Sequence, residues 1–391
     1  MTTTTARHYG LDWLRIGAFG LLILYHIGMF FVPWGWHVKT AEPIDWAAIP
    51  MLATNSWRLA LLFVVSGYAS RVLIEKLPGA GRFARERSAR LMIPVVAAMI
   101  LIIPPQPWIE LVTQHGYAQD LGWFWLNDYF GFKTMSGIVV PTWQHLWFVV
   151  YLWAYTLGLA LLSLAGIDRM QRVFDRLFGG IGLLAIPLAW ALIVALWLGR
   201  GAESTHALFD DWLGHITYLP AFLFGVGLGR SHAALAAAAR LWKPALALSA
   251  LAFAVIVAVE RQWPGNTPIP DGYADAFHAA RATMGWAMIV AAIGIAGRYW
   301  NHDHRWRPML TEAVFPFYII HQTIIVVVGW WLLRFALPPG VEFLIILAAT
   351  VAGCWAFYLI GRSVNWLRPL IGLKRVAPRA ASADSAVPKE A

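Results

Sequence analysis

Two residues of the first apolar segment have the types and spacing of an acid–base site inside a membrane. The segment opens with Leu11-Asp12-Trp13-Leu14-Arg15, and His26 follows Arg15 by eleven residues. Eleven residues make about three helical turns, so both side chains share one helix face and lie about 16 Å apart along the axis. His26 then lies about 20 Å from Asp12, past the midplane toward the outside.

An ionisable side chain at that depth is costly unless it faces a polar cavity, and such residues are functional candidates by default. Imidazole suits a general base because its unperturbed pKa of about 6.5 lies near physiological pH. The alternative is a packed histidine bonded to a neighbouring helix. We predict that His26 and Arg15 are catalytic, and that a helix other than the first one orients the imidazole.

Arginines cluster on the predicted cytoplasmic side, between the second and third apolar segments. The positive-inside rule accounts for most of them. A donor that carries phosphates would also find partners there, because guanidinium groups bind phosphate in a bidentate manner. Ser66 and Gly67 in the second segment permit close helix packing or contribute to the same site. The residues predicted to bind the donor are Arg15, Ser66, Arg71, Arg85, Arg87 and Arg90.

Aromatic and polar residues gather on the predicted outer side and in two late segments. Aromatic faces beside polar tips suit a carbohydrate, although interface anchoring explains many of the tryptophans equally well. No metal-ligand spacing stands out, and no permanently bound cofactor is expected. The residues predicted to bind the acceptor are His37, Glu42, His145, Trp147, Tyr218, Tyr318 and His321.

The elements that position these residues are transmembrane helices. Of 391 residues, 59% are hydrophobic and only 13% are charged, with a mean hydropathy of +0.60. Apolar runs of about 17 to 23 residues are long enough to cross the hydrocarbon core as helices. The sequence therefore predicts an all-α, multi-pass integral membrane protein with about ten spans, near 13–33, 57–75, 91–109, 145–166, 181–199, 213–229, 243–260, 281–299, 313–333 and 342–362.

The charge distribution predicts the orientation. With an N-terminus inside, about 23 of the 30 Lys and Arg residues fall on the cytoplasmic side, so both termini are predicted to be cytoplasmic. Topology explains most of the net charge of +9, and nucleic acid binding is an unnecessary inference. We expect one transmembrane domain over 1–370 and a disordered cytoplasmic tail over 371–391. No internal repeat is evident, which weakens a transporter interpretation.

Four ordered motifs resemble the acyltransferase-3 family of membrane acyltransferases. They are Arg15 with His26, the segment Phe63-Val-Val-Ser66-Gly67-Tyr68, the basic run from Arg85 to Pro94, and Tyr318 with His321. Within the family, the segments Trp36-His37-Val38, Ala41-Glu42-Pro43, His145-Leu146-Trp147-Phe148 and Tyr218-Leu219-Pro220 are most similar to the glucan biosynthesis protein C group, which succinylates periplasmic glucans.

The resemblance implies a bacterial inner-membrane enzyme that uses acyl-CoA from the cytoplasm as a cosubstrate and acylates a hydroxyl of a periplasmic glucan. Succinyl-CoA is the first expectation for the donor, and acetyl-CoA is the other. The alternatives are an O-acetyltransferase for another surface polysaccharide and a non-enzymatic transporter. Membrane lipid is the remaining expected partner, and the sequence leaves the oligomeric state open, a homo-oligomer included.

Overall fold

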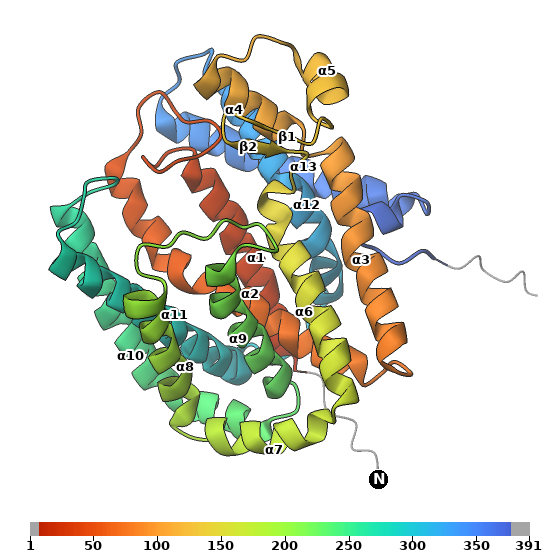
Figure 1. The fold of residues 1–391 in the computed structure, drawn as a ribbon, viewed down its shortest axis with the longest axis vertical. Helices are drawn as coiled ribbons and strands as arrows, with labels where there is room; N and C mark the ends of the chain where they lie inside the picture. Colours follow the sequence, from red (N-terminus) through yellow and green to blue (C-terminus); the bar gives the residue numbers. More distant parts are fainter. Residues whose placement is uncertain (1–7, 377–391) are drawn as a thin grey trace, which may run out of the picture.

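The computed structural model describes residues 8–376, which form a bundle of helices with one short hairpin (Figure 1). The all-α prediction is therefore confirmed. The main helices are α1 (Tyr9–Met29), α2 (Ala48–Ile74), α3 (Ala80–Leu101), α4 (Pro105–His115), α6 (Trp147–Leu164), α7 (Ile167–Phe178), α8 (Gly182–Ile193), α9 (Trp212–Leu228), α10 (His232–Gln262), α11 (Asp271–Tyr299), α12 (Arg307–Leu332) and α13 (Pro339–Ser363).

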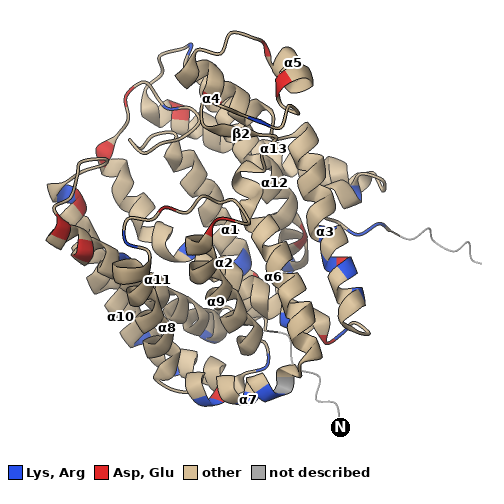
Figure 2. Cartoon of the chain, viewed as in Figure 1, with Lys and Arg blue, Asp and Glu red and all other residues tan. Residues whose placement is uncertain are grey.

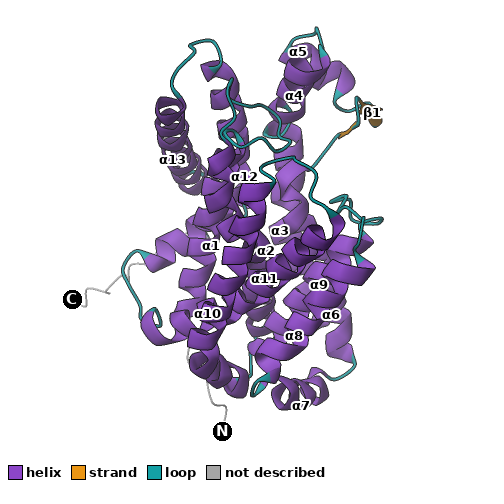
Figure 3. Cartoon of the chain, turned by 90° about the vertical axis from the view of Figure 1, so that its left-hand side faces the viewer, coloured by secondary structure: helices purple, strands orange, loops and turns teal. Residues whose placement is uncertain are grey.

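The remaining elements are short. Strands β1 (Lys133–Met135) and β2 (Ile138–Val140) pair antiparallel, with Thr134 opposite Val139. Single turns of helix make up the others: α5 (Leu121–Trp123) and the segments Asp45–Ala47, Phe124–Asp128, Gln144–Leu146, Val194–Leu198 and Arg368–Ile371. The hairpin and α5 cover one end of the bundle, and α7 lies at the opposite end (Figure 3).

Seven helices within residues 8–376 are long and apolar enough to cross a membrane, and counting each bent pair as one span gives up to nine. One bent pair is α3 with α4, at 44°, and the other joins α7 to α8, at 92°. The apolar helix α9 has only 17 residues. A multi-pass membrane protein is thus confirmed, whereas the number ten and the cytoplasmic termini stay predictions.

Basic residues gather on α7 and on the nearby end of α3, away from the hairpin (Figure 2). Arg169, Arg172 and Arg176 all lie on α7. An amphipathic helix that carries arginines on one side suits the interface with an anionic leaflet. Of the predicted tail, residues 377–391 lie outside the described residues, and Leu373 packs against α12 and α13.

Helix α1 lies at the centre of the bundle and packs against α2, α11 and α12. Helix α2 also packs closely on α9, because glycines replace side chains where the two backbones meet. A Cβ atom at Gly67 would lie 2.0 Å from the carbonyl oxygen of Phe222, and one at Gly225 would lie 1.9 Å from that of Val64. The expectation that Gly67 permits close helix contact is confirmed.

Replacing Gly67 with alanine is expected to destabilise the protein by about 1 to 3 kcal/mol, because the methyl group would collide with backbone that cannot move aside. The melting temperature in detergent measures this effect. Gly158→Ala on α6 is the matched control, since a Cβ there meets nothing within 4 Å. Equal melting temperatures for the two variants would contradict the packing argument.

Candidate active site

A pair of hydrogen-bonded histidines joins α1 to α12 inside the bundle. His26 Nδ1 lies 2.7 Å from His321 Nε2, and His321 Nδ1 lies 2.8 Å from the carbonyl oxygen of Tyr318. A carbonyl oxygen only accepts hydrogen bonds, so neutral His321 carries its proton on Nδ1 and accepts at Nε2. His26 therefore donates from Nδ1 and keeps the lone pair of Nε2 for another partner.

The two rings differ in accessibility. His321 is fully buried, whereas His26 keeps a partly exposed side chain. The His321 ring, which is hydrogen-bonded to the backbone, is therefore buried. The His26 ring, which keeps a lone pair on Nε2, remains partly accessible. A buried anchor that fixes the tautomer of a partly exposed imidazole is the arrangement that a general base requires.

His145 and Tyr318 brace this pair. His145 Nε2 donates to the carbonyl oxygen of Tyr318 at 3.0 Å, and the Tyr318 hydroxyl donates to the carbonyl oxygen of His145. The rings of His26 and His145 lie 6.5 Å apart. Both side chains thus hold the turn of α12 that carries His321, and Tyr318 acts through its backbone rather than through a free hydroxyl.

A second polar chain runs from the bend between α3 and α4 to His37. Gln322 donates to Gln106 Oε1 and to His37 Nε2, each at 3.0 Å. His37 Nδ1 in turn lies 2.5 Å from Glu110 Oε2. On α12, Tyr318, His321 and Gln322 are spaced i, i+3 and i+4, so one helix face serves both chains.

Three polar atoms around His26 are buried and have no hydrogen-bond partner in the described chain: Trp36 Nε1, His145 Nδ1 and Gln322 Oε1. The Trp36 ring centre lies 5.3 Å from that of His26. Buried polar atoms are normally satisfied, so three orphans in one place indicate that a polar ligand completes the site.

The predicted donor-binding residues divide into two groups. Arg15 donates to the carbonyl oxygen of Thr311 at 3.1 Å and lies within electrostatic range of Arg87, which also faces Arg90. The structure thus brings these three together near the N-terminal parts of α1 and α3. Arg85 is exposed, and Arg71 is buried and paired with Glu75 at 2.7 Å. Ser66 accepts a hydrogen bond from Ser70 through its backbone oxygen.

Three predicted acceptor-binding residues lie apart from the histidine pair. Glu42 is exposed in the loop after α1, and the carboxylate that binds His37 belongs to Glu110. Trp147 stacks on His206 with ring centres 4.3 Å apart, and Tyr218 stacks on Phe63 at 5.0 Å. Glu110 was missed because it directly follows the predicted span 91–109 and there resembles a solvated charge. In the structure it lies on α4, and only the fold brings it to a histidine.

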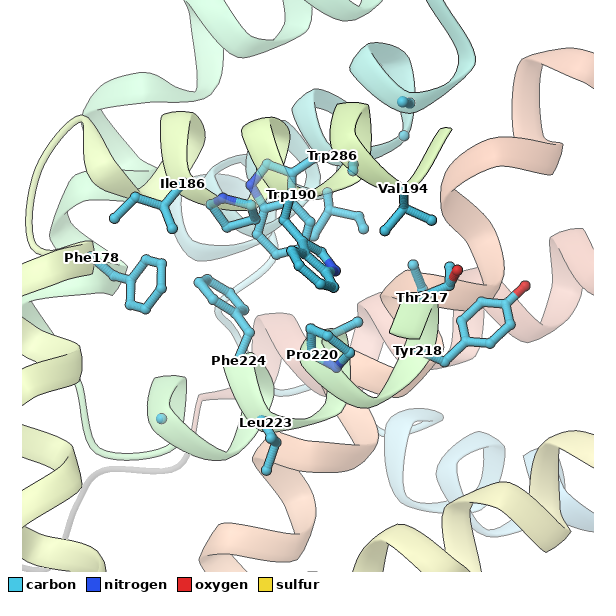
Figure 4. Close-up of a pocket in the computed structure, with 18 of the residues that line it drawn as sticks. Phe178, Ile186, Trp190, Val194, Thr217, Tyr218, Pro220, Leu223, Phe224 and Trp286 are labelled. Carbon is cyan, nitrogen blue, oxygen red and sulfur yellow. The ribbon is translucent and has the colours of Figure 1, made fainter. Parts of the chain in front are cut away.

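A cavity of about 760 Å³ opens between α2, α8, α9 and α11. Figure 4 shows Phe178 and Ile186 at one end and Thr217 and Tyr218 at the other. Arg281 also lines the wall. Among residues 8–376, no group of three or more His, Cys, Asp or Glu side chains is arranged to hold a metal ion.

Comparison with protein families assigns the chain to a known family. Residues 8–359 match the acyltransferase-3 family, described as an acyltransferase domain. The chain belongs to the acyltransferase-3 family. The match covers α1, which carries His26, and α12, which carries His321, so the histidine pair lies within the shared domain. The chain therefore carries the acyltransferase domain of this family, as the four motifs predicted.

The chain is also similar to curated proteins that share one name. The glucans biosynthesis protein C of Escherichia coli O1:K1 / APEC is 28% identical over 227 residues, which are 56% of this chain and 57% of the relative. The protein of the same name from E. coli O139:H28 (strain E24377A / ETEC) is 26% identical over 227 residues, which again are 56% of this chain and 57% of the relative. The chain thus spans less than two thirds of these relatives. No solved structure matches the chain.

Glu110→Gln is expected to lower kcat/KM for the acceptor about tenfold, because a neutral amide replaces a charge-assisted bond to His37. Steady-state kinetics with a varied acceptor concentration measure this. Glu42→Gln is the control, since an exposed side chain is expected to change the rate by less than about twofold. If Glu42→Gln lowered the rate more than Glu110→Gln, the assignment from the sequence would be restored.

Proposed function

We propose that this acyltransferase transfers a succinyl group from cytoplasmic succinyl-CoA to a hydroxyl of a periplasmic glucan, in the inner membrane of a bacterium. The observation that carries the reaction type is the pairing of His26 Nδ1 with His321 Nε2 at 2.7 Å, which leaves His26 Nε2 as a base. The names of the relatives support a glucan as the acceptor.

In the proposed step, the acceptor hydroxyl oxygen attacks the thioester carbonyl carbon while His26 Nε2 takes the hydroxyl proton. The new C–O bond forms, the C–S bond breaks, and the CoA thiolate leaves with the proton that His26 returns. His321 keeps the imidazole in the tautomer that accepts this proton. No group besides the two substrates is consumed.

Trp36 is the candidate donor to the developing oxyanion. Its indole Nε1–H is buried and unpaired in the described chain, and its ring lies beside His26. An indole nitrogen can only donate, so it suits a carbonyl oxygen that gains negative charge during attack. The other two orphan atoms, His145 Nδ1 and Gln322 Oε1, are acceptors and suit hydroxyl groups of the sugar.

The inner arginines complete the path of the donor. Arg15 and Arg90 both lie within electrostatic range of Arg87, so a phosphate group placed there would meet several guanidinium groups. Arg15 lies eleven residues before His26 on the continuous helix α1, about 16 Å along the axis. A donor held by its phosphates at the inner end therefore presents its thioester deeper in the membrane, toward His26.

Arg87→Gln is expected to raise KM for the acyl-CoA donor about tenfold with little change in kcat, because one charge-assisted contact to phosphate is lost. Initial rates at varied donor concentration measure this. Arg82→Gln is the control on the same helix, since Arg82 is 57% exposed and pairs with Glu86. Unchanged donor kinetics for Arg87→Gln would assign the cluster to topology alone.

The deciding experiment supplies the purified protein in nanodiscs with labelled succinyl-CoA or acetyl-CoA and a periplasmic glucan, and detects acylated glucan by mass spectrometry. Succinylated product is the expected result. Acetylated product alone would favour the O-acetyltransferase. Transport of glucan into proteoliposomes without consumption of either donor would favour the transporter and end the enzyme proposal.

A further inference from the structure

Two arginines in the membrane region have no acidic partner. Arg58 on α2 is 2% exposed, and Arg281 on α11 is partly buried. Within residues 8–376, neither guanidinium group forms an ion pair, whereas buried Arg71 pairs with Glu75 and buried Arg307 pairs with Asp12. An uncompensated charge at such a position costs several kcal/mol, so an anionic ligand would stabilise it.

Arg58 lies close to the proposed base. Its Cζ atom lies 3.8 Å from the centre of the Tyr25 ring, and that ring centre lies 6.1 Å from the His26 ring centre. These two distances together bound the separation, so the guanidinium carbon is within about 10 Å of the imidazole. Its Nη1 atom donates to Thr54 Oγ1 at 3.3 Å, and its guanidinium group also interacts with the Tyr25 side chain. Its Nε atom has no hydrogen-bond partner among residues 8–376.

Arg281 belongs to the same electrostatic cluster. Tyr25 and Tyr218 each lie within electrostatic range of both arginines. Arg281 and Tyr218 line the 760 Å³ cavity, so the Arg281 side of this cluster is open to a ligand. Glu260 on α10 lies within electrostatic range of Arg281 but forms no ion pair with it in the described chain. The Oε1 atom of Glu260 accepts from the backbone N–H of Gly265 at 2.9 Å.

We infer that Arg58 and Arg281 bind the distal carboxylate of a dicarboxylic acyl group whose thioester carbonyl lies at His26. The inference rests on the proposed succinyl transfer. The two carbonyl carbons of an extended succinyl group are about 4 Å apart, because three C–C bonds of about 1.5 Å join them. A charge-assisted bond adds about 3 Å, and the sum lies within the upper bound of about 10 Å between Arg58 and His26. A buried cation thus selects succinyl over an uncharged acyl group.

The test compares two donors of equal chain length, succinyl-CoA and n-butyryl-CoA, which has a methyl group in place of the carboxylate. For Arg58→Gln, kcat/KM for succinyl-CoA is expected to fall about 100-fold or more, since a charge-assisted bidentate contact is lost. Butyryl transfer is expected to stay within about threefold of its starting rate or to rise. Retained butyryl transfer also shows that the variant is folded.

Arg281→Gln is expected to change the donor preference in the same direction but less, because Arg281 is less buried. Arg200→Gln is the control. Arg200 is exposed and pairs with Asp275, and its replacement removes the same unit of positive charge. A ratio of succinyl to butyryl rates that is unchanged in Arg58→Gln would overturn the inference while the proposed function stands. A wild-type protein that transfers butyryl but not succinyl would overturn the proposed donor, and this inference with it.

Discussion

His26→Ala is expected to lower kcat for acyl transfer by about 10² to 10⁴-fold, because the loss of a general base typically has that effect. In the histidine pair, the hydrogen bonds occupy both nitrogens of His321 and Nδ1 of His26. Nε2 of His26 is therefore the one nitrogen with a free lone pair. Single-turnover transfer of a labelled acyl group to glucan measures the change. KM for the donor should stay nearly constant, because the imidazole binds no phosphate.

His115→Ala is the matched control for this variant. His115 is an exposed histidine at the end of α4, outside both polar chains. Its removal should leave kcat within about twofold. If His26→Ala kept full activity while remaining inserted and monodisperse, His26 would be excluded from the mechanism, and the site would have to be sought elsewhere.

His321→Leu is expected to lower kcat about 100-fold although His321 does not contact the substrate, because the His26 tautomer is no longer fixed. His321→Gln should recover much of that loss, since its amide oxygen can accept from His26 Nδ1. The comparison of the two variants in the same single-turnover assay measures the positioning role. A merely structural role would be served as well by leucine, which fills the same apolar space.

Equal rates for His321→Leu and His321→Gln would contradict the tautomer argument. The melting temperatures of both variants provide the control, because His321 is fully buried and braced by the backbone of Tyr318. If the glutamine variant were active and the leucine variant inactive at equal stability, the hydrogen bond rather than the packing would carry the effect.

The sequence alone determined the membrane class, the family and the chemistry of the individual residues. The spacing of Arg15 and His26 follows from helical periodicity, and α1 is continuous from Tyr9 to Met29 as expected. The need for a second helix to orient His26 was also predictable, since Asp12 lies too far along the axis. These inferences succeed because they depend on neighbours within a few helical turns.

The tertiary structure decided which of the candidate residues meet. His321 lies 295 residues after His26, and no periodicity relates the two. Glu110 rather than Glu42 binds His37, and Arg58 lies over the Tyr25 ring although in the sequence it resembles an ordinary charge near the end of a span. Such contacts depend on which helices pack together, and the packing is fixed by the summed fit of many side chains and by close approaches such as the one at Gly67.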